Sequence, residues 1–540
     1  IGFTTGKYAT GSYNTFVGAE AGVGGTTSAP YSSGQSNVAL GYQAFKSFTT
    51  GYSNTVMGTN AGDAINTGYE NAIFGQGAGS ALTDGHDNVM IGQVAGGTST
   101  SVGHAVIIGE FAGGSGDITD AADGVVLIGG GAGRNLTTGG YNLAIGYASM
   151  LRHTTGHSNI AIGYGAMDDT DAGSNSLDSD NNIFIGVNSG GGTWANAKSE
   201  FNVAIGNYVM DGALDGASNN TALGYQALSS ITTEDANVAI GHHAMYQGGG
   251  SQNIAIGDNA MSQGPTGGTN YAIGRYTMMD CNAGATALSS NSNIAFGHSA
   301  LGGTWADAAS NYNIAIGHNA MDGALNGASN NVAIGYQAMS ATTTSDHMVV
   351  IGMQAGENVS TGASSVIVGK DAGRAFYTTT NSVLIGYSAG EYIGQGNTGA
   401  TDSVHIGFTT GKYATGSYNT FVGSEAGVGG TTSAPYSAGE QNTAVGYQAL
   451  KSFTNSEGGL NTVIGYQAGQ SVQDGNANTY LGSRAGQAQT VGDANLAIGD
   501  RALYSDTSGH RTIAIGKDAL HAFSGSGTTT FNSDITKIIA

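Results

Sequence analysis

Hydrophobic residues recur along the chain in short groups that end at a glycine, and longer polar stretches separate the groups. The full pattern is Asn, any residue, a mostly small residue, Ile or Val, Gly, two further residues and Ala, and it occurs 29 times. The residue before the glycine is apolar in all 29 copies and is Ile or Val in 23 of them. Because branched side chains favour a pleated, packed surface, each repeat is predicted to contain one short β-strand.

The spacing of these anchoring glycines, which run from Gly2 and Gly18 to Gly499 and Gly516, indicates the architecture. Of the 28 intervals between them, 14 are 17 residues long and the others range from 16 to 23. One repeat of this length makes one coil of a parallel β-solenoid, in which strands of successive coils pair at about 4.8 Å. We therefore predict an all-β fold, a parallel β-solenoid or β-roll of about 29 coils. It would be a rod roughly 130 Å long, continuous over residues 1–523, with an end segment at 524–540.

Two further positions of the repeat are nearly constant. Asn stands four places before the glycine in 21 of the 28 copies that have this position, and Ala stands three places after it in 23 of 29. Asn amides that bond to their equivalents in the coils above and below would form a ladder. The ladder positions are represented by Asn54, Asn71, Asn88, Asn237, Asn331 and Asn495. The Ala suits a tight corner facing a narrow interior, and the glycine suits a bend or a close backbone approach.

The alternation of strand residues predicts which of them face the interior. The Ile before the glycine and the residue two before it are expected to point inward, and the small residue between them to point outward. Such a coil buries few apolar groups and presents a flat, Ala-rich outer side. We expect that side to pack on further copies of the chain, most simply as a homotrimer, with a monomeric solenoid as the alternative.

Two longer duplications overlie the short repeat. The spacing of residues 163–274 recurs in 274–385, and residues 1–36 recur at 406–441 with four changes. Copying blocks of coils lengthens a rod without altering its cross-section, which fits poorly with a single finely built active site. Because Ile1 and Gly2 already lie inside the repeat, we expect the chain to be a piece of a longer polypeptide.

Composition and charge exclude several classes of protein. The chain of 540 residues has 94 glycines without a three-residue period and 3 prolines, which excludes a collagen helix. A net charge of −22 argues against binding nucleic acid or an anionic membrane surface. The chain has no run of about 18 apolar residues, so the sequence does not predict membrane insertion. The chain has a single cysteine, Cys281, which excludes an internal disulfide.

Candidate chemistry is sparse. The densest acidic stretch, between Gly163 and Gly186, offers oxygen ligands for calcium. It consists of Asp168, Asp169, Asp171, Asp178 and Asp180. Four of these five charges vanish in the internal copy, which favours a solvated loop. His242 and His243 occupy a corner that tolerates many residue types, so we predict no metal there. No catalytic motif is found, so we expect no enzyme activity, catalytic residue or cofactor.

The widened coils offer the candidate contacts with a partner. Intervals of 23 residues insert about six residues at one corner; these loops hold Tyr31 and Tyr436 and lie next to Trp194 and Trp305. Solenoid loops often carry binding surfaces, and Trp is a good anchor for a carbohydrate or a protein. Alternatively, each Trp caps a widened coil. Tyrosine follows the anchoring glycine in eight copies, where we expect stacking between coils rather than sugar binding.

The pattern, as in Asn159 to Gly163 and Asn253 to Gly257, resembles the head repeats of trimeric autotransporter adhesins and the repetitive tail fibre proteins of bacteriophages. Gly-Tyr-Gln-Ala variants, as at Gly41 to Ala44, look more like the phage fibres. The resemblance implies a trimer of left-handed β-rolls that projects from a virus or a bacterial surface and binds cells or matrix.

The leading hypothesis is therefore a structural and host-recognition fibre of the phage tail fibre type, extracellular or on a virion, with a cell-surface glycan or protein as its receptor. A bacterial surface adhesin or a self-assembling extracellular filament is the alternative. An ice-binding solenoid, motivated by Thr pairs such as Thr49-Thr50, ranks last because the coil length varies.

Overall fold

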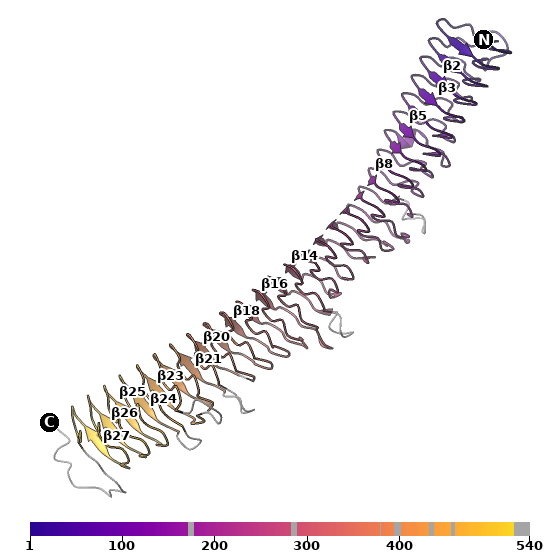
Figure 1. The fold of residues 1–540 in the computed structure, drawn as a ribbon. Helices are drawn as coiled ribbons and strands as arrows, with labels where there is room; N and C mark the ends of the chain where they lie inside the picture. The colour runs from indigo at the N-terminus through magenta and orange to yellow at the C-terminus, as the bar shows by residue number, and fades with distance from the viewer. Residues whose placement is uncertain are drawn as a thin grey trace. The chain divides into compact units, whose positions relative to one another are not determined.

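The computed structural model describes residues 1–170, 178–281, 289–378, 380–393, 401–430, 437–454 and 459–522. The chain divides into two compact units, Ile1–Ser262 and Gln263–Ala540. Within each unit, short parallel strands of successive coils lie side by side (Figure 1). The prediction of an all-β parallel solenoid with one strand per repeat is confirmed. The predicted end segment at 524–540 lies outside the described residues.

Among its described residues, the first unit contains fourteen strands and the short 3₁₀ helix η1. They are β1 (Thr15–Val17), β2 (Val38–Leu40), β3 (Thr55–Met57), β4 (Ala72–Phe74), β5 (Val89–Ile91), β6 (Val106–Ile108), η1 (Asp120–Ala122), β7 (Val126–Ile128), β8 (Leu143–Ile145), β9 (Ile160–Ile162), β10 (Ile183–Ile185), β11 (Val203–Ile205), β12 (Thr221–Leu223), β13 (Val238–Ile240) and β14 (Ile254–Ile256).

The second unit contains a further fourteen strands. They are β15 (Tyr271–Ile273), β16 (Ile294–Phe296), β17 (Ile314–Ile316), β18 (Val332–Ile334), β19 (Val349–Ile351), β20 (Val366–Val368), β21 (Val383–Ile385), β22 (Val404–Ile406), β23 (Thr420–Val422), β24 (Thr443–Val445), β25 (Thr462–Ile464), β26 (Thr479–Leu481), β27 (Leu496–Ile498) and β28 (Ile513–Ile515). No helix among the described residues is long and apolar enough to cross a membrane.

Each strand ends at an anchoring glycine, which turns the chain in a conformation that other residues rarely adopt. Gly58 has a φ of +139°, and a Cβ atom there would lie 2.3 Å from the carbonyl oxygen of Gly75 in the next coil. The same contact recurs along the repeat, as at Gly335, where a Cβ would lie 2.4 Å from the Gly352 oxygen. Both reasons proposed for the glycine, unusual φ and close backbone approach, are therefore confirmed.

The prediction of which strand residues face inward is wrong. In every strand after β1 the middle residue is buried and its two neighbours are partly or fully exposed. In β9, for example, Ala161 is buried whereas Ile160 and Ile162 are half-buried. The backbone alternates as predicted, but the face is reversed, because the interior at this level is too narrow for two branched side chains per strand.

Beside the strand, each coil places one large side chain in the interior, supplied from one of two positions. These are the middle residue of the strand and the residue six places later, at the corner after the anchoring glycine. In 14 strands the middle residue is Ala and the corner residue is Met, Leu or Phe; in the other 14 the middle residue is large and the corner residue is Gly. The first kind comprises β2, β8, β9, β11 to β18, β24, β27 and β28.

Direct contact explains this exchange. A Cβ atom at Gly190 would lie 2.6 Å from the ring of Phe184, the middle residue of β10. A Cβ atom at Gly427 would lie 2.4 Å from the ring of Phe421, the middle residue of β23. These two glycines thus vacate the space that the large strand residue fills, as close packing of an interior requires.

Candidate functional site

The outward side of the strands is a uniform surface that the repeat creates. We call it the outer strand face and define it as the first and third residues of strands β1 to β28. None of these residues is charged, and the third residue is apolar in every strand. Partial exposure is typical, reaching 54% for Phe296 and 51% for Ile513. The predicted Ala-rich outer side is thus corrected to a face rich in Ile and Val.

The predicted asparagine ladder is confirmed by its hydrogen bonds. The backbone N of Asn54 donates to Asn37 Oδ1 at 2.9 Å, and Asn54 Nδ2 donates to the same oxygen at 3.1 Å. Asn54 Nδ2 also donates at 2.9 Å to the carbonyl oxygen of Gly68, one turn further along the chain. Asn71, Asn88, Asn331 and Asn495 make equivalent bonds.

Asn237 fits the ladder less completely. Its backbone N donates to Asn220 Oδ1 at 2.9 Å, and its Oδ1 accepts from the backbone N of Asn253 at 2.9 Å. Its Nδ2 is buried without a hydrogen-bond partner. The ladder residues are therefore structural, with one weaker rung at Asn237.

The two tryptophans are inside the coil, so the prediction that they contact a partner is wrong. Trp194 and Trp305 are both fully buried. Trp194 Nε1 donates to the carbonyl oxygen of Gly190 at 3.0 Å, and Trp305 Nε1 donates to that of Leu301 at 3.2 Å. The alternative, that each Trp fills a widened coil, is confirmed, because the extra length of the coil creates a wider interior.

Of the two tyrosines proposed as partner contacts, Tyr31 lies at the surface. Its side chain is 44% exposed, and its ring stacks on that of Tyr8 with 6.1 Å between centroids. Tyr436, its counterpart in the duplicated block, lies outside the described residues. The duplication itself is visible in structure, because the ion pair between Lys46 and Glu20 recurs between Lys451 and Glu425.

Aromatic residues after the anchoring glycines stack between coils, as predicted. The rings of Tyr147 and Tyr164 are 5.6 Å apart at an interplanar angle of 14°. His298 and His318 occupy the same column position and stack at 4.7 Å with an angle of 8°. Since each ring lies on its neighbour, these side chains reinforce the corner while their outer edges stay exposed.

The acids of the stretch between Gly163 and Gly186 are bound to neighbouring protein groups. Asp169 pairs with Arg152 at 2.8 Å, and Asp178 accepts a hydrogen bond from Thr155. Burial, with repulsion from Asp169, raises the pKa of Asp168. Asp171 lies outside the described residues. None of the described acids belongs to a group of three ligand atoms within 4.8 Å.

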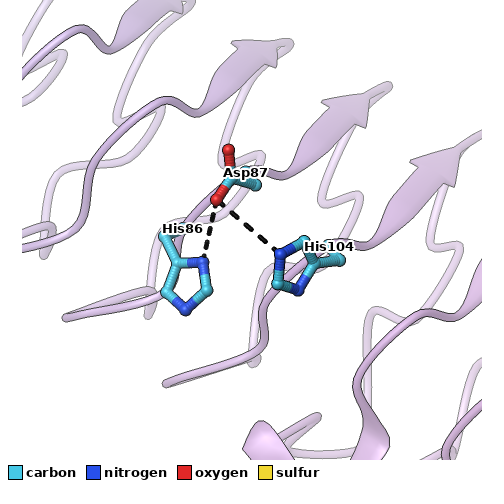
Figure 2. Close-up of side chains that lie close together, drawn as sticks. All are labelled: His86, Asp87 and His104. Carbon is cyan, nitrogen blue, oxygen red and sulfur yellow. Dashed lines mark hydrogen bonds and ion pairs between the residues drawn. The ribbon is translucent and has the colours of Figure 1, made fainter.

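One group of potential metal ligands does converge within the described part of the chain. One ligand atom each from His86, Asp87 and His104 lies within 4.8 Å of the others. Figure 2 shows both imidazole rings turned toward the Asp87 carboxylate. Sequence reasoning missed this group, because it considered histidines only beside the anchoring glycines. The available signal was that Asp87 and His104 each follow an anchoring glycine by twelve residues.

A scan against protein-family models found no match, and a search of curated proteins found none.

Proposed function

We propose that the chain is a structural and host-recognition module of the fibre type, in which copies of the chain associate through their outer strand faces. The observation that carries this proposal is that uncharged face, rich in Ile and Val, within each unit. An apolar face of this kind is rarely left exposed to water, since contiguous apolar patches beyond a few hundred Å² generally mark interaction sites.

The outer strand face extends along each unit. With two outward residues in each of its 14 strands, each unit presents a face of partly exposed, mainly apolar side chains. A standard stable interface buries about 800 Å² per partner. A stable association through this face would bury a comparable area.

A second copy of the chain is the occupant that fits this face best. Each chain carries a net charge of −22, and the outer strand face carries no charge, so contact through this face places the fewest like charges close together. Successive strands repeat in register, as Val238 on Ile254 and Ile240 on Ile256, so another copy presents side chains at the same spacing. Three copies around a three-fold axis would close the assembly, which is the form we propose.

The test is the native mass of the purified chain by light scattering. We expect about three times 53.8 kDa. Ile316→Lys with Ile334→Lys places two charges on the outer strand face of unit 2 and is expected to lower the mass toward one chain. Tyr336→Lys, at a corner position that is 47% exposed, is the matched control and should leave the mass unchanged. A single-chain mass for the unaltered protein at all concentrations would contradict the proposal.

The recognition part of the proposal rests on the resemblance of the repeat and on exposed aromatic residues such as Tyr31. It is tested by binding of the labelled chain to intact bacterial cells. Tyr31→Ala should weaken binding, whereas Tyr13→Ala, at a residue that is 86% exposed, serves as the control. Equal binding by both variants would remove Tyr31 from the contact.

A further inference from the structure

The feature that carries a further inference is the group formed by His86, Asp87 and His104 in unit 1. His86 and Asp87 lie in the coil that starts at Gly75, and His104 lies in the coil that starts at Gly92. Asp87 and His104 occupy equivalent places in these coils and share a left-handed backbone, with φ of +56° and +51°. Stacking of the coils therefore brings two imidazoles and one carboxylate to the same corner (Figure 2).

The distances within this group suit the ligands of one metal ion. Asp87 Oδ2 lies 3.1 Å from His86 Nδ1 and 3.9 Å from His104 Nε2. Bonds of about 2.1 Å from a tetrahedral zinc ion place neighbouring ligand atoms about 3.4 Å apart. The 3.9 Å separation is too long for a hydrogen bond but is within the range of an ion pair with a protonated imidazole.

A second carboxylate holds His104 in this orientation. His104 Nδ1 lies 3.0 Å from Asp123 Oδ1, and the same oxygen accepts a hydrogen bond from the backbone N of Gly124 at 3.0 Å. Histidines that bind metals generally use their second ring nitrogen to donate to a carboxylate or carbonyl, which fixes the ring and raises its basicity. Asp123 supplies that arrangement and leaves Nε2 free for a ligand.

Contacts with both neighbouring coils hold the His86 ring in place. Its ring stacks on Tyr69 on one side, with 4.9 Å between centroids and an angle of 8°. In the next coil the equivalent position is Gly103, where a Cβ would lie 3.0 Å from His86 Cε1 and 3.4 Å from Asp123 Oδ1. The column of rings therefore ends at His86, and the His104 ring meets it edge-on at 5.1 Å.

Other histidine and aspartate pairs on the surface lack this arrangement. His242 lies 3.1 Å from Asp258, and His510 lies 3.3 Å from Asp493, but among the described residues neither pair belongs to a group of three ligand atoms within 4.8 Å. At Asp87 a single oxygen faces two imidazoles. Two imidazoles and a carboxylate are donors that zinc and related divalent transition metals accept readily.

We propose that His86, Asp87 and His104 bind one divalent transition metal ion, best matched by zinc, that links two consecutive coils of unit 1. Asp123 is the positioning residue for His104. The side chains of the three ligands are 31%, 36% and 58% exposed, so water completes the coordination of the bound ion. This role is independent of the association proposed for the outer strand face.

The test is a calorimetric titration of the full chain with zinc after treatment with a chelator. His86→Phe keeps the stacking on Tyr69 but removes the ligand nitrogen. His104→Asn keeps a residue type that tolerates left-handed backbone. We expect both variants to lose the tightest site, of one ion per chain, while the control His510→Asn retains it. Zinc binding by both ligand variants with unchanged affinity and stoichiometry would overturn the proposal.

Two further measurements separate metal binding from a structural role of these residues. Cobalt titrated into the unaltered chain should give the intense visible absorption of a low-coordinate protein site, which His104→Asn should abolish. Asp123→Asn should weaken zinc binding about 10- to 100-fold while keeping the stoichiometry. An octahedral, weakly absorbing cobalt spectrum would contradict the coordination proposed, and unchanged affinity in Asp123→Asn would contradict the role of Asp123.

Discussion

The coils of β11 to β14 in unit 1 and those of β19 to β23 in unit 2 fill the same cross-section in opposite ways. In the first group Ala is the middle strand residue and Met or Leu occupies the corner, as in Ala239 and Met245. In the second group the strand residue is large and the corner is Gly, as in Ile367 and Gly373. The interior thus constrains the side-chain volume that each coil supplies. The position that supplies this volume, the strand or the corner, can change from coil to coil.

Single coils of one kind also occur among coils of the other. The coil of β10, with Phe184 and Gly190, follows that of β9 with Ala161 and precedes that of β11 with Ala204. Where β10 pairs with β11, Phe184 lies directly beside Ala204. Neighbouring coils therefore do not have to supply the large side chain from the same position.

The largest expected effect comes from the anchoring glycines, because both kinds of coil depend on them. Gly241→Ala and Gly369→Ala would each place a Cβ 2.4 Å from a glycine carbonyl oxygen in the next coil, at φ of +137° and +132°. Neither backbone can shift independently of its neighbours. We expect each change to lower the free energy of unfolding by about 5 kcal/mol, measured by denaturant unfolding.

Equal losses in the two variants would confirm that the corner is common to both kinds of coil. A loss below about 1 kcal/mol in either variant would show that the contact with the next coil is relieved by movement of the backbone.

The repeat explains which parts of the structure could be predicted from sequence. The strand, the anchoring glycine and the Asn ladder each recur at a fixed position, so a local rule identified them. The inward face was predicted wrongly because Ile160, Ala161 and Ile162 are all apolar, and hydrophobicity alone does not distinguish the two faces. The sequence signal that does distinguish the two faces is the exchange of size between the middle strand residue and the corner residue. When one of these two residues is large, the other is Ala or Gly.

The candidate sites were less accessible to such reasoning. Trp194 was treated as a surface anchor because it lies in a widened coil, but the insertion also widens the interior. His86, Asp87 and His104 come together through the stacking of coils with a particular register, which the motif does not encode. Their contacts depend on how far each residue lies from its own anchoring glycine.

The exchange of volume can be tested at β10. Phe184→Ala should leave a cavity and cost about 3–5 kcal/mol, and Gly190→Met should clash with the Phe184 ring and cost about 1–3 kcal/mol. The double variant reproduces the Ala and Met pair of its neighbours, and we expect it to recover at least half of the summed loss. The measurement is a double-mutant cycle of unfolding free energies.

The reciprocal control is the coil of β24, where Ala444 and Leu450 lie between coils with a large strand residue. Ala444→Val with Leu450→Gly should be better tolerated than Leu450→Gly alone. Additive losses in both cycles would refute the volume rule.

A smaller effect is expected for the rungs of the ladder, which also differ between the two groups. Asn202 Nδ2 donates to Asn182 Oδ1 and to the Ala217 carbonyl oxygen, at 3.1 and 2.8 Å. In unit 2, Ser382 replaces the amide and its Oγ accepts from the backbone N of Ser403 at 3.3 Å. In Asn202→Ser the hydroxyl should still accept a hydrogen bond from the backbone of the next coil. The carbonyl oxygen of Ala217 would lose the hydrogen bond from Asn202 Nδ2.

We expect this change to cost about 1–3 kcal/mol, measured by unfolding and by faster amide hydrogen exchange in the adjacent coils. Ser382→Ala is the matched change in the other group, and it should cost less because it removes fewer bonds. An equal or larger loss for Ser382→Ala would show that the hydroxyl ladder is as strong as the amide ladder.

Buried ionisable groups give the two kinds of coil opposite responses to pH. Asp322 follows the corner residue Met321, and burial raises its pKa to about 6, although the charge of His318 opposes the shift. The native state therefore keeps a proton that the unfolded chain loses above its ordinary pKa of 3.8. Stability should fall as pH rises from about 4 to about 6, and Asp322→Asn should remove this fall in melting temperatures measured across that range.

His405, the middle residue of β22, has the opposite effect. It is fully buried against Phe421, and neither ring nitrogen has a hydrogen-bond partner within the described structure. Burial lowers its pKa to about 3, from an ordinary value of 6.5. As pH falls from about 6.5 to about 3, the unfolded chain binds a proton that the native state excludes, so stability is lost in acid.

His405→Phe tests this difference at a position where the next strand already carries Phe421 and where Gly411 leaves room for a ring. The substitution removes two unsatisfied nitrogens, so we expect a higher melting temperature at pH 7 and a smaller loss between pH 6 and pH 4. His510→Asn, at a partly exposed histidine, controls for the loss of a titrating group. A melting curve for His405→Phe that keeps the acid sensitivity of the unaltered chain would place the sensitivity elsewhere.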